Sequence, residues 1–95
     1  MPFYIAIVED TGPDAAIGVW FPDLPGCFSA GDTMDEAVAN APEAVAAYAE
    51  ALAADGRQLP LPRTLVELKR DPAFIADVSG NMVALVTAPE RIPAE

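Results

Sequence analysis

The feature that most constrains the fold is one long helical pattern in the middle of the chain. Between Thr33 and Gly56, apolar residues recur every three or four positions, the spacing at which side chains share one face of an α-helix. Thr33 and Glu36 form a Thr-x-x-Glu capping box at its start, and Gly56 supplies a left-handed stop at its end. A helix with one apolar stripe must bury that stripe against another element. The stripe consists of Met34, Ala37, Val38, Ala41, Val45, Tyr48, Ala49 and Leu52.

Three segments with strand character precede this helix. Residues 3–9 and 16–21 are rich in β-branched and aromatic side chains, and a polar turn with Gly12 and Pro13 joins them, which predicts an antiparallel hairpin. Residues 22–26 contain two prolines and are predicted to form a turn outside the strand ladder. Residues 27–30 are predicted to form a short third strand.

Shorter elements follow the helix. Pro60 and Pro62 mark a connector, and a second capping box at Thr64 predicts a short helix over residues 64–70, which Asp71-Pro72 ends. The pattern over 73–80 is ambiguous and could form another helical turn. Residues 81–87, which read NMVALVT, are predicted to form the last strand.

The resulting order, β-β-β-α-(short α)-β, predicts an α+β two-layer sandwich. The last strand is expected beside the first, in strand order 3-2-1-4, and the crossover rule then makes these two strands parallel. Such a sheet would be a partial ribonuclease H-like or double-stranded-RNA-binding-domain-like sheet. Residues 1–87 are expected to form one domain, and residues 88–95 a flexible tail or the start of a linker.

Charge is distributed unevenly along the chain. The net charge is −10, and residues 1–56 contain ten acidic residues but neither lysine nor arginine. Such a field repels nucleic-acid phosphates and attracts basic partners, which argues against direct binding of DNA or RNA through this part of the chain. Solubility alone is the competing explanation.

Catalytic residues are sparse. The chain has no histidine for acid–base chemistry, and its only candidate metal-binding carboxylates are Glu9 and Asp10 after the first strand and Asp35 and Glu36 at the helix start. The last strand contributes no acid, and the capping box already explains Glu36. We therefore predict no metal site, no cofactor and no enzyme activity, with a residual metal-dependent ribonuclease as the alternative. Cys27 is predicted to be a buried core residue and not a reactive thiol.

The single cysteine cannot form a disulfide within one chain. The N-terminus has no signal-peptide pattern, and no apolar run approaches the roughly 18 residues that a membrane span requires. These features predict a cytoplasmic protein without membrane contact.

Residues 19–33, which read VWFPDLPGCFSAGDT, resemble the signature region of HicB-type antitoxins. That signature has a strand ending in FPDLPGC, a short strand, Gly-Asp-Thr, and a helix that opens with an acidic, alanine-rich sequence. The resemblance extends over roughly residues 3–87. The motif residues are Phe21, Pro22, Asp23, Leu24, Pro25, Gly26, Cys27, Gly31, Asp32 and Thr33.

The resemblance implies a partial ribonuclease H-like fold and a role as an antitoxin. HicB proteins pair with HicA, a small basic toxin that cleaves mRNA, and neutralise it by covering its active site. Many form dimers or tetramers and carry a C-terminal DNA-binding domain. Residues 88–95 are too short for such a domain, so operator binding is expected only if that domain is missing from this chain. A standalone oligomerisation or scaffold module is the alternative function.

Candidate partner contacts come from the rigid turn and the acidic residues. Trp20 and Phe21 are adjacent on a strand and must face opposite sides, so one of them is expected to pack under the helix and the other to face outward. Each group has a purely structural alternative. The outward aromatic residue would be a half-covered sheet residue, residues 22–26 an ordinary turn, and the acidic residues a solvated helix face. The candidates are Trp20, Phe21, Asp23, Leu24, Asp32, Asp35, Glu36 and Glu43.

Overall fold

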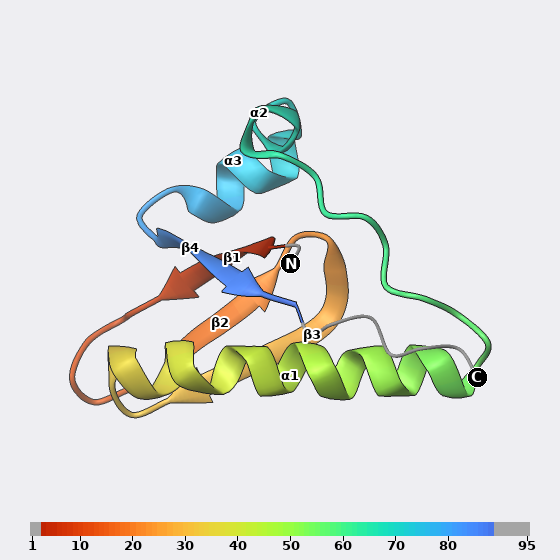
Figure 1. The fold of residues 1–95 in the computed structure, drawn as a ribbon. Helices are drawn as coiled ribbons and strands as arrows, with labels where there is room; N and C mark the ends of the chain where they lie inside the picture. Colours follow the sequence, from red (N-terminus) through yellow and green to blue (C-terminus); the bar gives the residue numbers. More distant parts are fainter. Residues whose placement is uncertain (1–2, 89–95) are drawn as a thin grey trace.

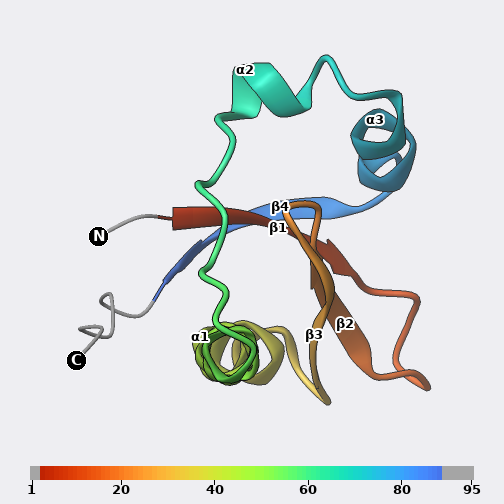
Figure 2. The same ribbon diagram turned by 90° about the vertical axis from the view of Figure 1, so that its right-hand side faces the viewer.

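The computed structural model describes residues 3–88, which form one four-stranded sheet with helices on both of its faces. Helix α1 lies across one face, and α2 and α3 lie over the other (Figures 1 and 2). The sheet order is β3-β2-β1-β4, so the predicted α+β class and strand order 3-2-1-4 are confirmed. The elements are β1 (Phe3–Glu9), β2 (Ile17–Phe21), β3 (Leu24–Gly31), α1 (Met34–Ala54), α2 (Leu65–Leu68), α3 (Pro72–Val78) and β4 (Met82–Thr87).

The direction of β4 differs from the prediction. β4 runs antiparallel to β1, with Phe3 opposite Thr87 and Val8 opposite Met82. A single helical crossing would have made the two strands parallel. Here α1 crosses one face, the connector passes the start of β1, where the Tyr4 hydroxyl donates to the Pro60 carbonyl, and α2 and α3 then cross the other face (Figure 2). This second crossing returns the chain to the end of β1, so β4 runs in the opposite direction.

The start of β3 also differs from the prediction. The strand begins at Leu24, which pairs with Phe21, although Phe28 pairs with Trp20 one position earlier on β2. Residues 25–27 therefore bulge out of the ladder between these pairs. Proline has no N–H to donate, and Gly26 has a φ of 85° that other residues avoid, so the bulge suits this sequence. The strand was expected only from residue 27 because the prolines mask this short pairing.

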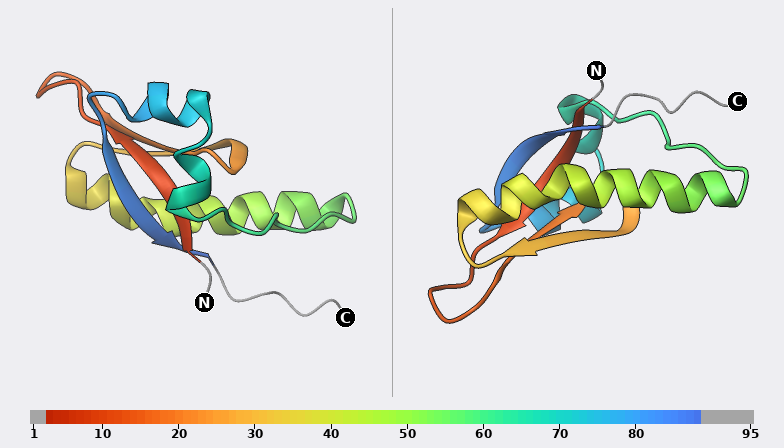
Figure 3. Two further views of the ribbon diagram at one scale, coloured as in Figure 1. Left: turned by 90° about the horizontal axis from the view of Figure 1, so that it is seen from above. Right: turned by 60° about the horizontal axis from the view of Figure 1, so that its bottom comes forward.

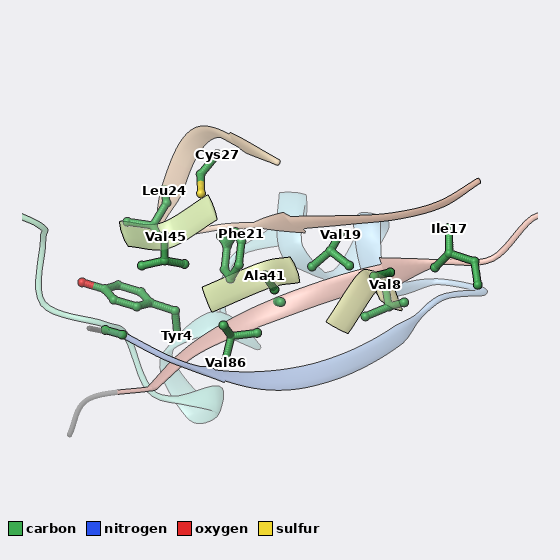
Figure 4. Close-up of a cluster of buried hydrophobic side chains, with 13 residues drawn as sticks. Tyr4, Val8, Ile17, Val19, Phe21, Leu24, Cys27, Ala41, Val45 and Val86 are labelled. Atoms are coloured by element: carbon green, nitrogen blue, oxygen red, sulfur yellow. The ribbon is translucent and has the colours of Figure 1, made fainter. Parts of the chain in front are cut away.

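The main core lies between α1 and the sheet (Figure 4). The predicted apolar stripe faces inward, and its buried members are Ala37, Ala41, Val45 and Leu52. The sheet contributes Tyr4, Val8, Ile17, Val19, Phe21, Leu24, Cys27 and Val86 to this layer. Because Ala37 and Ala41 are small, the helix can approach the strands closely.

A smaller core lies on the opposite face of the sheet. Ile5 and Ile7 of β1 pack there with Leu68 of α2 and Phe74 of α3, and Trp20 packs against this cluster while remaining partly exposed. Phe21 is therefore the residue that lies under α1, and Trp20 points to the other face. The sequence left residues 73–80 ambiguous, and in the structure Pro72–Val78 form α3, which covers this face together with α2. Asp71 caps α3, and Pro72 occupies its first turn, where no backbone N–H is needed.

The helix ends largely follow the predicted caps. The Thr64 and Glu67 capping box is complete, with both reciprocal hydrogen bonds present. At the start of α1, Thr33 accepts from the backbone of Glu36 as predicted, whereas the Glu36 carboxylate accepts from the N–H of Asp32, one residue before the cap. Gly56 has a φ of 73°, as its role as a stop requires. None of the helices within residues 3–88 combines the length and the apolar character that a membrane span requires.

The expected tail starts at Ala88, which is buried, and its remaining residues lie outside the described part of the chain.

Candidate protein-binding surface

Three glutamates form a straight row along the outer side of α1. Glu36, Glu43 and Glu50 are spaced by seven residues, which brings each of them back to almost the same angle on the helix, about 10 Å further along its axis. All three are exposed, and α1 is open to solvent on its outer side (Figure 3). The row lies opposite the buried stripe, so the same helical period that builds the core also presents these carboxylates.

Asp32 and Asp35 extend this acidic surface at the start of α1. Both are exposed, and the N–H of Asp32 donates to the Glu36 carboxylate at 3.1 Å, which holds Glu36 in place. Asp32 also lines a shallow depression of about 340 Å³ with Asp10 from the end of β1. We call Asp32, Asp35, Glu36, Glu43 and Glu50 the acidic row. Sequence reasoning identified the first four as contact candidates, and the seven-residue spacing adds Glu50.

The acidic residues do not gather into a metal site. Within residues 3–88, no three histidine, cysteine, aspartate or glutamate side chains come together in a way that could hold an ion. Glu9 and Asp10 stand at the end of β1, whereas Asp35 and Glu36 open α1. Of these four, Glu36 is engaged in the helix cap and Asp10 accepts from the N–H of Gly12 in its own turn.

Asp23 has an internal partner. Its side chain is only 7% exposed, and its two oxygens accept from the backbone N–H of Arg63 at 2.7 Å and from the Arg63 Nε at 2.6 Å. Arg63 also donates to Asp71 at 3.2 Å. The hydrogen bond to Asp23 raises the pKa of the Arg63 guanidinium, and bonds from the Ala73 N–H and from Arg63 lower the pKa of Asp71. Asp23 therefore ties the β2–β3 turn to the connector and α3.

Two of the predicted contact residues are inaccessible to a partner in this conformation. Phe21 and Leu24 are both buried beneath α1. Leu24 was named a contact candidate as part of the rigid turn, but at the start of β3 its side chain packs into the core. Cys27 is buried, as predicted, and burial raises the pKa of its thiol, which favours the protonated form.

Apolar side chains that sequence reasoning missed are exposed on the face opposite α1. Phe28 lies opposite the partly exposed Trp20 in the ladder and is 69% exposed. On the same face but at the opposite edge of the sheet, a groove of about 540 Å³ lies between strands β1 and β4 and the start of α2. Its lining residues are Phe3, Ile5, Pro62, Arg63, Thr64, Leu65, Val83 and Leu85. The signal in the sequence was the stretch MVALVT, which has apolar residues at both alternating sets of positions.

Arg63→Met is expected to lower the free energy of unfolding by about 1–2 kcal/mol. Removing one member of a buried ion pair costs about 3–5 kcal/mol, and the smaller value follows because the Arg63 side chain is 36% exposed and Asp23 keeps its bond from the backbone N–H. Urea denaturation of the variant measures this loss. Arg70→Met, at an exposed position, is the matched control and should change stability by less than about 0.5 kcal/mol. Equal effects of both variants would show that the Asp23 contact contributes nothing.

Comparison with known proteins shows that the chain is similar to bacterial antitoxins. The sequence model for the HicB_like antitoxin of bacterial toxin-antitoxin systems matches residues 3–91. A 14.9 kDa protein from the rep-hol intergenic region of Haemophilus phage HP1 is 42% identical over 75 residues, which are 75% of this chain and 56% of that protein. The chain therefore spans little more than half the length of this relative.

Two solved structures are similar across most of the chain. One is a HicA3 and HicB3 toxin-antitoxin complex, with 31% identity, a TM-score of 0.70, and coverage of 92% of this chain and 98% of that chain. The other is the Burkholderia pseudomallei antitoxin HicB, with 30% identity, a TM-score of 0.74, and coverage of 100% of this chain and 75% of that chain.

Proposed function

The chain belongs to the HicB-like antitoxin family of bacterial toxin-antitoxin systems, and we propose that it neutralises a small, basic, HicA-like toxin by binding it directly and covering its active site. The similarity to a chain of a HicA3–HicB3 complex supports this choice of partner. A toxin that cleaves mRNA acts where mRNA is translated, so the proposal assigns the encounter to the cytoplasm.

The acidic row is the observation that carries the proposal. A basic protein that binds RNA presents positive charge, and the row offers it exposed carboxylates along the length of α1. At about 1.5 Å per residue, the 21 residues of α1 extend over about 30 Å, which is enough to span one face of a small protein. Residues 1–56 contain no lysine or arginine to interrupt this field.

The same charges would also exclude the substrate. A carboxylate row placed over a ribonuclease site repels phosphate groups, so an antitoxin bound in this way blocks RNA both by covering the site and by electrostatic repulsion. The proposed contact residues are therefore Asp32, Asp35, Glu36, Glu43 and Glu50. Trp20 stays a proposed apolar contact, since it is partly exposed on the other face. In this proposal Asp23, Phe21 and Leu24 act indirectly, by holding the turn and α1 in place.

The double substitution Glu43→Lys and Glu50→Lys is expected to weaken toxin binding about tenfold, because it turns two attractive charges into repulsive ones. The dependence of the dissociation constant on salt should also become shallower. Both positions lie outside the helix cap, so α1 should remain intact. Titration calorimetry with a separately purified HicA-like toxin, repeated at several salt concentrations, measures both effects.

The control for this experiment changes the same amount of charge elsewhere. Asp14→Lys with Asp77→Lys alters exposed residues of the β1–β2 turn and of α3 and leaves the acidic row intact. It should weaken binding much less than the α1 pair. If both double variants bind alike, or if the α1 pair leaves the affinity and its salt dependence unchanged, the acidic row is not the toxin-binding surface.

A further inference from the structure

Four apolar side chains form one row across the whole sheet, on the face opposite α1. Phe28 of β3 pairs with Trp20 of β2, and Trp20 pairs with Ile7 of β1. Ile7 in turn pairs with Val83 of β4. Because residues directly opposite in antiparallel strands point to the same side, all four side chains lie on one face. The ends of the row are exposed, at 69% for Phe28 and 41% for Val83, whereas Ile7 in its middle is fully buried.

Only two short helices cover the middle of this row (Figure 2). We call residues 64–78, which contain α2 and α3, the lid. Its only buried side chains are Leu68 of α2 and Phe74 of α3, which pack with Ile5 and Ile7 of β1. The two helices have four and seven residues, and isolated helices of less than about 12 residues are not stable in water. The lid therefore depends on these two side chains to remain on the sheet.

The segments on either side of the lid can change their backbone angles without moving a packed side chain. Before the lid, the Tyr4 hydroxyl holds the connector at the Pro60 carbonyl, and the next residue, Leu61, is 90% exposed. After the lid, Gly80 is exposed and has a φ of 79°, and glycine adopts other backbone angles at little cost. Both ends of the lid are therefore suited to act as hinges.

Arg63, just before the lid, fastens it to the sheet. Its Nε donates to Asp23 in the β2–β3 turn at 2.6 Å, and its Nη1 donates to Asp71, the cap of α3, at 3.2 Å. The Asp23 side chain is 7% exposed, whereas that of Asp71 is 34% exposed. Since water weakens an exposed ion pair, the bond to Asp23 is the fixed anchor of Arg63, and the bond to Asp71 is the one that can break first.

We propose that α2 and α3 open together as one lid, with the Arg63–Asp71 pair as its latch, while α1 and the sheet stay folded. Opening uncovers Ile5 and Ile7 and so joins the exposed ends of the row into one apolar surface across all four strands. The main core can survive this opening, because no residue of the lid belongs to it. The acidic row is carried by α1, so the proposal does not depend on the proposed toxin-binding role.

Hydrogen exchange of the unsubstituted chain, measured in increasing urea below the unfolding transition, tests the proposal. The amides of Leu68, Lys69 and Ile75 donate within the lid. Relative to their rates in an unfolded chain, they should exchange at least about tenfold faster than the amides of α1. Because the opening exposes little surface, the three amides should share one shallow urea dependence, whereas the α1 amides should show the steep dependence of global unfolding.

Two results of this experiment would overturn the proposal. One common urea dependence for the lid and α1 would show that the chain opens only as a whole. Lid amides without any urea dependence would show that single turns fray and that the lid does not open as a unit. Val45→Ala adds a second check, since Val45 belongs to the main core. It should speed exchange in α1 and leave the lid amides unchanged, because the closed and open forms lose the same contacts; faster exchange of the lid would contradict independent opening.

Asp71→Asn tests the latch. Asparagine caps a helix as well as aspartate does, so the variant removes the charge opposite Arg63 and keeps the start of α3. The lid amides should then exchange about two- to fivefold faster, as expected for the loss of a partly exposed ion pair. Asp77→Asn, at an exposed position of α3, makes the same change of charge and should not speed their exchange. Equal exchange in the two variants would overturn the role of the Arg63–Asp71 pair as the latch.

Discussion

Replacing Gly31 with alanine is expected to lower the free energy of unfolding by about 3 kcal/mol or more. A Cβ atom at this position would lie 2.4 Å from the backbone nitrogen of Ala37 and 2.8 Å from the carbonyl carbon of Glu36. Both are backbone atoms of the first turns of α1, so no side-chain rotation can relieve the overlap. The helix would have to move away from β3, and the core beneath it would open.

The sheet offers a matched control for this substitution. Gly18 lies on β2, the strand that neighbours β3, and a Cβ there would meet nothing within 4 Å. Gly18→Ala should therefore leave stability unchanged or raise it slightly, since alanine restricts the unfolded chain more than glycine does. Urea denaturation of both variants measures the difference. A Gly31→Ala variant as stable as Gly18→Ala would show that α1 does not rest on β3 as closely as the structure has it.

This close contact gives a physical reason for one part of the sequence signature. Gly31 permits the approach of α1, Thr33 caps the helix, and the N–H of Asp32 holds the Glu36 carboxylate beside that cap. The Gly-Asp-Thr segment therefore fixes where α1 starts and how closely it lies on the sheet. Since the acidic row is carried by α1, this segment also positions the proposed toxin-binding surface.

Local patterns in the sequence predicted the elements that depend on local physics. Helical periodicity identified α1, and because the buried stripe and the acidic row share one period, it also predicted that the acids would be exposed. Capping residues located the starts of α1 and α2. The order 3-2-1 followed from the succession of the first three strands, since consecutive strands tend to be neighbours, whereas the place of the last strand beside the first was a separate expectation.

Features that depend on distant parts of the chain could not be predicted in this way. The direction of β4 depends on whether the segment between Pro60 and Val78 crosses the second face, and the ambiguous residues 73–80 gave no basis for a second crossing. Asp23 was named a candidate partner contact, with a local turn as the alternative, and its ion pair was missed because its partner, Arg63, lies 40 positions away. The exposed apolar residues of β4 were missed because alternation in a strand does not show which neighbours cover it.

The burial of Leu24 also depends on distant parts of the chain, and it leads to the second large expected effect. Leu24→Ala should lower the free energy of unfolding by about 3 kcal/mol, within the range of about 2–5 kcal/mol for truncating a buried leucine. The side chain is fully buried between the sheet and α1, near Tyr4, Phe21 and Val45 (Figure 4). Thermal and urea denaturation measure this loss.

Toxin affinity separates a core role for Leu24 from a contact role. At a temperature where the variant is fully folded, a core residue should leave the dissociation constant for a HicA-like toxin within about twofold of the original, a change of less than about 0.5 kcal/mol. Leu61→Ala, at a position 90% exposed, is the control and should change stability by less than about 0.5 kcal/mol. A folded Leu24→Ala protein that loses affinity while keeping its stability would restore Leu24 as a direct contact. In that case the turn before the bulge would have to open when the partner binds, because the side chain is inaccessible in the unbound chain.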